Sequence, residues 1–197
     1  MRRGDLSKLC RKLRSLGIDY VLVGGMAVEL AGHETGTEDV DLLVSLAEYQ
    51  GTFEKLAGDR NFRHMEALET IGGGQFFTGD RWIDLDFINP RLFRGKLSAE
   101  RFVSYVKRYR SRKTAFGRVA APEVTWYMRL VVPDWEIYVQ KILRDIRAGV
   151  PDELLGEALA IARHLGVDDV VRQRIEKVKE MAGMMIQSSS QDAGPRA

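Results

Sequence analysis

Two aspartates one residue apart are the part of this sequence best suited to chemistry. Asp39 and Asp41 open the apolar segment Asp-Val-Asp-Leu-Leu-Val, a short distance after the double glycine Gly24-Gly25. In a β-strand, residues i and i+2 point to the same face, so the two carboxylates would lie side by side. Close carboxylates repel each other unless a cation neutralises them, and Mg²⁺ prefers such oxygen ligands together with phosphate oxygens. The spacing therefore predicts a metal site for phosphate chemistry.

A second acidic strand, residues 81–88, offers a third carboxylate. Its residues alternate, so that Asp84 and Asp86 share one face while apolar side chains occupy the other. If this strand lies beside the Asp39 strand, three carboxylates converge, as expected for two metals about 3.5–4 Å apart that clamp an in-line displacement. Because Asp84 and Asp86 share a face, either one fits the third position.

The elements that must position these acids can be predicted from the apolar pattern. An apolar run at 18–23 ends in the double glycine and predicts the strand that precedes the acids. Around it we expect a helix that ends at Gly17, a short helix over 26–31, a strand over 39–45 and a helix over 46–57.

Three consecutive glycines, residues 72–74, stand between two β-rich segments. We interpret them as a hairpin turn rather than a phosphate-binding loop, because no helix follows them. Pro90 then ends the acidic strand. Beyond Val119 the pattern becomes helical, and three acidic helix-start signals predict a bundle of helices, at Pro133-Asp134, Pro151-Asp152 and Asp168-Asp169.

Residues 20–45 resemble the signature of the DNA polymerase β-like nucleotidyltransferase superfamily. That signature is a hydrophobic strand ending in Gly-Gly or Gly-Ser, then Asp-x-Asp, then a later hydrophobic-Asp-hydrophobic strand. Within the superfamily, the chain is most similar to small prokaryotic nucleotidyltransferases with a helical C-terminal extension, including those of toxin-antitoxin pairs. The resemblance implies an α+β fold, with a mixed β-sheet nucleotidyltransferase domain flanked by helices and followed by a C-terminal helical bundle.

The resemblance also implies roles for the acids. Asp39 and Asp41 would bind both metals, and Asp84 would complete the first site and help to deprotonate the attacking hydroxyl. We favour Asp84 over Asp86 because Ile-Asp84-Leu fits the usual pattern, and we keep both as candidate metal ligands. The implied metal is Mg²⁺, with Mn²⁺ as the alternative ion.

Further residues match the family's substrate contacts. By the resemblance, Gly24 and Gly25 would let backbone amides approach the β- and γ-phosphates of the nucleotide. Thr37 fits the family pattern Arg-x-Thr-x-Asp-x-Asp, but Thr35 stands where the arginine would be, so one positive contact is missing. Lys141 occupies a place comparable to a lysine that reaches the triphosphate in relatives, and its alternative interpretation is an exposed surface lysine.

The segment 91–118 is strongly basic, with Glu100 as its lone acid. Cations interleaved with aromatic rings are suited to a nucleic-acid backbone and its bases, and a positive cleft for a triphosphate would look similar. For the rings of Phe102, Tyr105 and Tyr109 we slightly favour a third interpretation, an amphipathic helix whose aromatics face the core. The basic residues are Arg91, Arg94, Lys96, Arg101, Lys107, Arg108, Arg110, Arg112, Lys113 and Arg118.

Length and composition are those of a compact protein with a hydrophobic core: 197 residues, 45% hydrophobic, with a net charge of +2. We expect a nucleotidyltransferase-like α/β domain at 1–118, a helical domain at 119–187, and a disordered tail at 188–197, where apolar residues are scarce. No signal region or apolar run of membrane-spanning length is present, and Cys10 is a lone cysteine, so we expect a cytoplasmic protein without membrane contact. The histidines show no zinc spacing, and His33 is interpreted as a loop residue.

These observations favour a Mg²⁺-dependent nucleotidyltransferase, in which a hydroxyl attacks the α-phosphate of an NTP and pyrophosphate leaves. The acceptor would be a tRNA or another RNA end, a protein side chain or a small molecule, and the basic segment tilts the choice towards RNA. The alternative is a non-catalytic NTP- or protein-binding member of a toxin-antitoxin-type pair, which would use its C-terminal helices to bind a partner protein.

Overall fold

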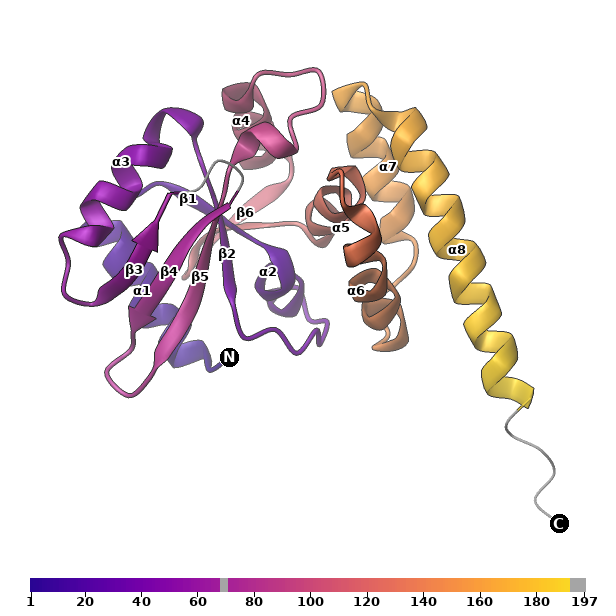
Figure 1. Ribbon diagram of the computed structural model, residues 1–197, viewed down its shortest axis with the longest axis horizontal. Helices are drawn as coiled ribbons and strands as arrows, with labels where there is room; N and C mark the ends of the chain where they lie inside the picture. Colours follow the sequence, from indigo (N-terminus) through magenta and orange to yellow (C-terminus); the bar gives the residue numbers. More distant parts are fainter. Residues whose placement is uncertain (68–70, 192–197) are drawn as a thin grey trace, which may run out of the picture.

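The computed structural model describes residues 1–67 and 71–191, with side chains described as far as residue 183. It has the expected α+β architecture: a mixed sheet of seven strands with helices on both faces, and a group of C-terminal helices packed beside it (Figure 1). The fold class predicted from the sequence is therefore confirmed.

The sheet has the strand order β3-β4-β5-β2-β1-β7-β6. Its centre is mixed, because β2 runs antiparallel to β1 and parallel to β5, while β1 runs parallel to β7. The strands are β1 (Tyr20–Val23), β2 (Val40–Val44), β3 (Phe62–Glu66), β4 (Ile71–Phe77), β5 (Trp82–Ile88), β6 (Ser111–Thr114) and β7 (Gly117–Ala120).

The helices fall into an N-terminal and a C-terminal group. In Figure 1, α5 to α8 gather on the right-hand side of the molecule, and the sheet lies to the left with α1 and α3. The helices are α1 (Arg3–Ser15), α2 (Gly24–Leu30), α3 (Leu46–Ala57), the short 3₁₀ helix η1 (Pro90–Leu92), α4 (Ala99–Tyr109), α5 (Pro122–Val131), α6 (Trp135–Arg147), α7 (Leu154–Leu165) and α8 (Asp168–Gln191).

Strand β1 is buried on both faces, and its alternate residues belong to two different cores. Tyr20 and Leu22 pack in the cluster that contains α1 and α3, whereas Val21 and Val23 pack in the cluster that contains α4 to α8. The same period of two divides β2, where Leu43 belongs to the second cluster. Asp41 has the same parity as Leu43, so its side chain is on the sheet face that looks towards the C-terminal helices.

Most elements lie where the sequence predicted them, and α3 has the predicted bounds. The hairpin turn predicted at residues 72–74 is wrong, because these glycines lie inside β4. A Cβ on Gly72 would come within 2.4 Å of the Phe53 ring, and one on Gly73 within 2.7 Å of the Leu85 carbonyl oxygen. The glycines therefore allow close packing within the sheet rather than a turn.

The predicted tail at 188–197 overlaps the end of α8, and residues 192–197 lie outside the described residues. The domain boundaries stay a prediction. Over the part of the chain that is described, none of the helices combines the length and apolar character needed to cross a membrane.

One buried hydrogen bond connects α5 to the segment after β5. The hydroxyl of Tyr127 donates to the carbonyl oxygen of Phe93 at 2.7 Å. We expect Tyr127→Phe to lower the free energy of unfolding by about 1–3 kcal/mol, because the buried carbonyl loses its donor. Tyr138→Phe is the matched control: it removes a hydroxyl with no partner in the described residues and should change stability by less than about 0.5 kcal/mol. Urea unfolding measures both, and equal effects would contradict the expectation.

Candidate active site

Three carboxylates come together where β2 and β5 lie side by side. Asp39 directly precedes β2, Asp41 lies within it, and Asp86 lies in β5 directly opposite Asp41. One oxygen from each residue can be chosen so that all three lie within 4.8 Å of one another. In the described part of the chain, this is the one group of three or more acidic, histidine or cysteine side chains arranged to hold a metal ion.

The third carboxylate of this group is Asp86, whereas Asp84, which we favoured from the sequence, lies outside it. The parallel register pairs Asp41 with Asp86, which leaves Asp84 two residues away along the strand, or about 6.6 Å. Asp84 is exposed and accepts a hydrogen bond from Gln75 Nε2 at 2.7 Å. Both residues share a face, as predicted, but the register between strands decides which of them meets Asp39 and Asp41.

Asp39 is held in place by the loop that leads into β2. The hydroxyl of Thr37 donates to Asp39 Oδ1, and the backbone N–H of Thr37 donates to Glu29 Oε1 at 3.0 Å. Thr35 is buried, and its hydroxyl lies 3.2 Å from both the Gly25 carbonyl oxygen and Glu29 Oε1. Thr35, at the position where the resemblance expects an arginine, therefore ties this loop to α2.

The double glycine makes room for the acids. Gly24 has φ +67°, and a Cβ there would lie 1.6 Å from Asp41 Oδ2. A Cβ on Gly25 would lie 2.7 Å from the Cβ of Thr37. Helix α2 begins at Gly24, two residues earlier than predicted. Glycine is thus required here for the approach of Asp41 and Thr37, and contact of these glycines with phosphate stays a prediction.

The cluster carries an unfavourable concentration of negative charge. Burial, with the charges of Asp39 and Asp86, raises the pKa of Asp41 to about 7, while Arg129 and Lys141 oppose that rise. The pKa of Asp86 is also raised, first by burial and then by Asp39 and Asp84. A divalent cation would relieve both effects, and oxygen-only ligands are those that Mg²⁺ and Mn²⁺ accept.

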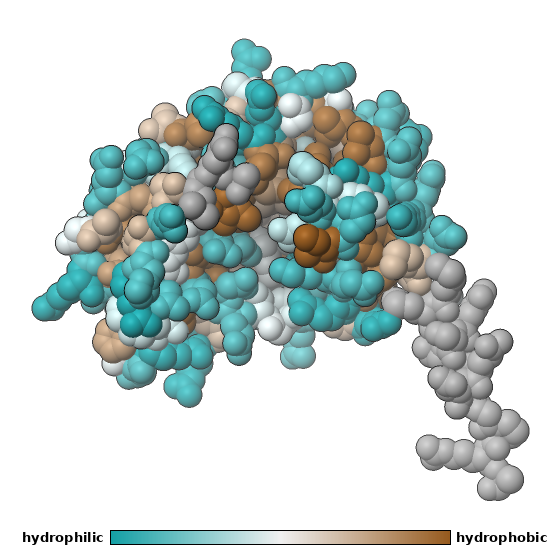
Figure 2. Space-filling model, in the orientation of Figure 1, coloured by the Kyte–Doolittle hydropathy of each residue, from teal (hydrophilic) through white to brown (hydrophobic). Residues whose placement is uncertain are grey.

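The acids line a cavity of about 360 Å³ between the sheet and the C-terminal helices. Figure 2 shows hydrophobic residues around the hollow between these two parts of the molecule. The opposite wall carries three cations from α5 and α6, namely Arg129, Lys141 and Arg144. The remaining wall is mostly apolar: Ile71, Ile88, Leu92, Phe93, Met128, Val132, Pro133, Ile137 and Tyr138.

Some of the residues that line the acidic cavity were predicted from the sequence, and others were not. The structure brings Gly24, Gly25, Thr37 and Lys141 into the lining with the acids, although Lys141 itself is exposed. It adds Arg129, for which the sequence offered no signal, because the role of an arginine in a mostly apolar helix is recognisable only once its spatial neighbours are known.

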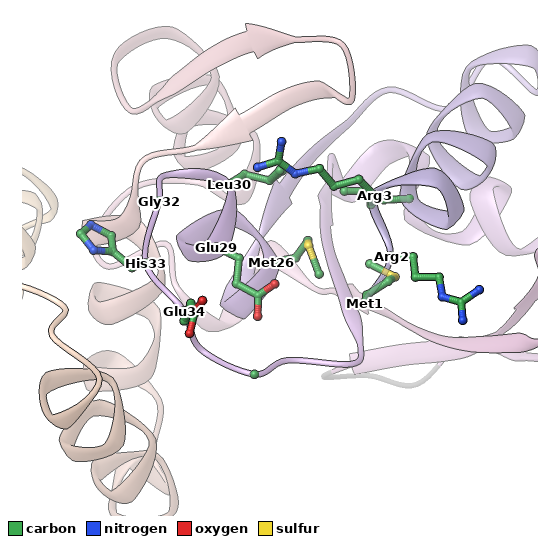
Figure 3. A pocket seen from close by; sticks show the side chains of 11 residues that line it. Met1, Arg2, Arg3, Met26, Glu29, Leu30, Gly32, His33 and Glu34 are labelled. Carbon is green, nitrogen blue, oxygen red and sulfur yellow. The ribbon is translucent and has the colours of Figure 1, made fainter.

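A second cavity, of about 490 Å³, lies at the N-terminal end of α1 (Figure 3). Figure 3 shows Arg2 and Arg3 on one side, and Glu29, His33 and Glu34 around the loop on the other. His33 lines this cavity and is not part of the lining of the acidic one. The acids on its walls do not form a metal-binding group, so it is not the candidate active site.

The basic segment divides into buried rings and exposed cations. Phe102 and Tyr105 are buried in the core, as we favoured, whereas Tyr109 is 62% exposed. Lys107 and Arg110 form ion pairs with acids elsewhere in the fold. Several other cations are exposed, among them Arg91, Arg94, Lys96, Arg101, Arg108, Arg112 and Lys113.

Comparison with known protein families finds no match, and no curated protein matches the sequence. Among solved structures, the chain is similar to one from H. pylori described as "putative nucleotidyltransferase". The two share 13% sequence identity with a TM-score of 0.40, and the alignment covers 96% of this chain and 93% of that one. A likeness at this level assigns no family, so the function has to be argued from the site.

Two glycines with the same backbone conformation test the need for space at the acids. Gly17 has φ +66° with nothing near a Cβ, whereas Gly24 has φ +67° with Asp41 in the way. Gly17→Ala should cost about 1–2 kcal/mol, the ordinary cost of a left-handed conformation. We expect Gly24→Ala to cost clearly more and to abolish stabilisation by Mg²⁺ or Mn²⁺. Urea unfolding with and without the metal measures this, and equal costs with intact metal response would show that Asp41 moves aside freely.

The raised pKa of Asp41 predicts a pH dependence of stability in the absence of metal. Between about pH 4 and pH 7 the carboxyl is ionised in the unfolded chain but still protonated in the folded protein. Stability should therefore fall as pH rises through this window, by at most about 1.4 kcal/mol per pH unit from this group. Asp41→Asn lacks this contribution, so in EDTA it should gain on the wild type as pH rises. Parallel stability profiles from pH 4.5 to 7.5 would contradict the shift.

Proposed function

We propose that this protein is a metal-dependent nucleotidyltransferase, which moves an NMP from an NTP to a hydroxyl acceptor and releases pyrophosphate. The observation that carries the proposal is the convergence of Asp39, Asp41 and Asp86 on one wall of a cavity with cations on another. The cavity volume of about 360 Å³ lies within the range of small-molecule sites. Carboxylates with cations opposite suit a ligand that carries both a metal and several phosphates.

Each acid has a place in the proposed mechanism. Asp39, Asp41 and Asp86 would hold Mg²⁺, which when bound polarises phosphate oxygens and stabilises the charge that develops in an in-line displacement. Asp86 takes over the role that the resemblance gave to Asp84, accepting the proton of the attacking hydroxyl. Thr37 fixes the orientation of Asp39 through its hydroxyl.

The other walls would bind the rest of the nucleotide. Lys141 lines the cavity on α6, and its charge acts on both Asp41 and Asp86, which supports a contact with a metal-bound phosphate. The apolar wall includes Ile137, which is 69% exposed, and the neighbouring Tyr138. An exposed isoleucine beside a tyrosine offers a surface for a base or sugar, where apolar contact is gained on binding.

The acceptor we favour is RNA, because the exposed cations around α4 and β6 accompany the exposed ring of Tyr109. Phosphate contacts of this kind weaken steeply with salt. A protein side chain or a small molecule would need no such surface. The cytoplasm is the compartment we propose, and the non-catalytic, toxin-antitoxin-type interpretation becomes an outcome of the test below.

The two aspartates of β5 give a matched test of the mechanism. We expect transfer of label from α-labelled NTPs to RNA in the presence of Mg²⁺ or Mn²⁺. Asp86→Asn should lower the rate by at least about a hundredfold, because stabilisation of transition-state charge by a metal amounts to several kcal/mol. Asp84→Asn, the same change two residues away on the same face, should retain most of the activity.

Thermal unfolding of each variant serves as the control for folding. If Asp84→Asn loses as much activity as Asp86→Asn, the assignment of the base is wrong. If Mg-NTP stabilises the wild type but no label reaches RNA, protein or a small hydroxyl acceptor, the protein is a nucleotide-binding partner rather than an enzyme.

A further inference from the structure

Arg129 is a cation that lines the cavity from a mostly apolar helix. It lies on α5, is 9% exposed, and lines the same cavity as the three carboxylates. Its Nη1 donates to Oδ2 of Asp145, a residue of α6 that is 0% exposed. The indole N–H of Trp126 donates to the same oxygen at 3.4 Å. Asp145 therefore holds the guanidinium through Nη1, with its own carboxylate fully buried.

The pair is poorly explained as a device for stability. Burying two charges costs several kcal/mol per ion and is repaid only when the remaining donors and acceptors are also satisfied. Within the described part of the chain, Asp145 Oδ1 has no hydrogen-bond partner, and Arg144 Nε lies 4.0 Å from it. A guanidinium has five N–H donors, and Asp145 is the one acceptor that the described residues offer to Arg129.

The N–H groups of Arg129 that do not bond to Asp145 need an acceptor in the cavity. Because the side chain is nine-tenths buried and lines that cavity, an occupant is the partner available to it. Among the cations of this wall Arg129 alone is held rigidly, since Lys141 and Arg144 are both exposed. A fixed guanidinium fork binds two oxygens of one anionic group, which a mobile ammonium does less well.

We propose that Arg129, positioned by Asp145, binds the pyrophosphate part of the nucleotide. The inference rests on the proposed function, because it takes the metal site as the place where the triphosphate is held. Asp39, Asp41 and Asp86 would hold the metal, which would supply positive charge to the phosphate oxygens, and Arg129 on α5 would donate to oxygens of the same group. Pyrophosphate is common to every NTP, so this contact serves whichever base the protein selects. Asp145 is a positioning residue, since it acts through Arg129.

The test is binding of Mg-pyrophosphate, measured by calorimetry on the full chain. Arg129→Gln alone leaves Asp145 as an unpaired buried charge and endangers folding. The informative variant is therefore Arg129→Gln/Asp145→Asn, which removes both charges and keeps the side chains similar in size. Arg129→Lys keeps the charge and loses the fork, and Arg60→Gln is the control for loss of one positive charge at an exposed position outside the cavity and outside the basic segment.

We expect the double variant to bind Mg-pyrophosphate at least about tenfold more weakly than the wild type, Arg129→Lys to fall between them, and Arg60→Gln to match the wild type. All the variants should still bind Mn²⁺, and binding of Mg-NMP should weaken less than binding of Mg-pyrophosphate, whereas a merely structural role would weaken all three ligands alike.

Pyrophosphate binding by the double variant within twofold of the wild type would overturn the inference and leave the proposed function standing. A wild type that binds Mg-NTP but not Mg-pyrophosphate would likewise overturn the inference and leave the proposed function standing. A wild type that binds neither ligand would overturn both proposals.

Discussion

Repulsion between three carboxylates is the constraint on which the rest of this structure depends. Asp39, Asp41 and Asp86 offer oxygens within 4.8 Å of one another, and all three residues are partly buried. Such a group costs free energy in the folded protein unless positive charge compensates it. The neighbouring features fit this need: a glycine whose lack of a side chain admits Asp41, a threonine that donates to Asp39, and cations on the facing helices.

The sheet and the C-terminal helices contribute different halves of the site. Alternation along β2 and β5 sends the acids to the face of the sheet that the C-terminal helices cover, while the residues between them pack with α1 and α3. Helices α5 and α6 then supply the cations and much of the apolar wall. A hydrogen bond from the Thr125 hydroxyl to the Gly24 carbonyl oxygen, at 3.1 Å, joins the two halves beside the glycine turn. The geometry of the β-strands therefore places the acids, and the packing of the helices places the positive charges that complement them.

The sequence predicted what depends on local pattern and missed what depends on distant neighbours. The strand with Asp39 and Asp41, the glycine turn before it and the later acidic strand all follow from periodicity. The choice between Asp84 and Asp86 does not, because register between β2 and β5 is set by the packing of the whole sheet. The glycines at 72–74 resembled a turn because their close neighbours, Phe53 and Leu85, are invisible in a local pattern. Arg129 was missed since its partner, Asp145, lies on another helix.

The residues that line the acidic cavity are spread along the sequence from Gly24 to Arg144. They are therefore synthesised at different times. During synthesis, at about 5–20 residues per second, the glycine turn leaves the ribosome roughly 6–24 seconds before the last lining residue. The nascent chain thus carries Asp39, Asp41 and Asp86 for some time before α5 and α6 exist to enclose them. A chain made only as far as β5 therefore lacks the cationic wall, and the ability to engage a nucleotide should arise only after Arg144 has been added.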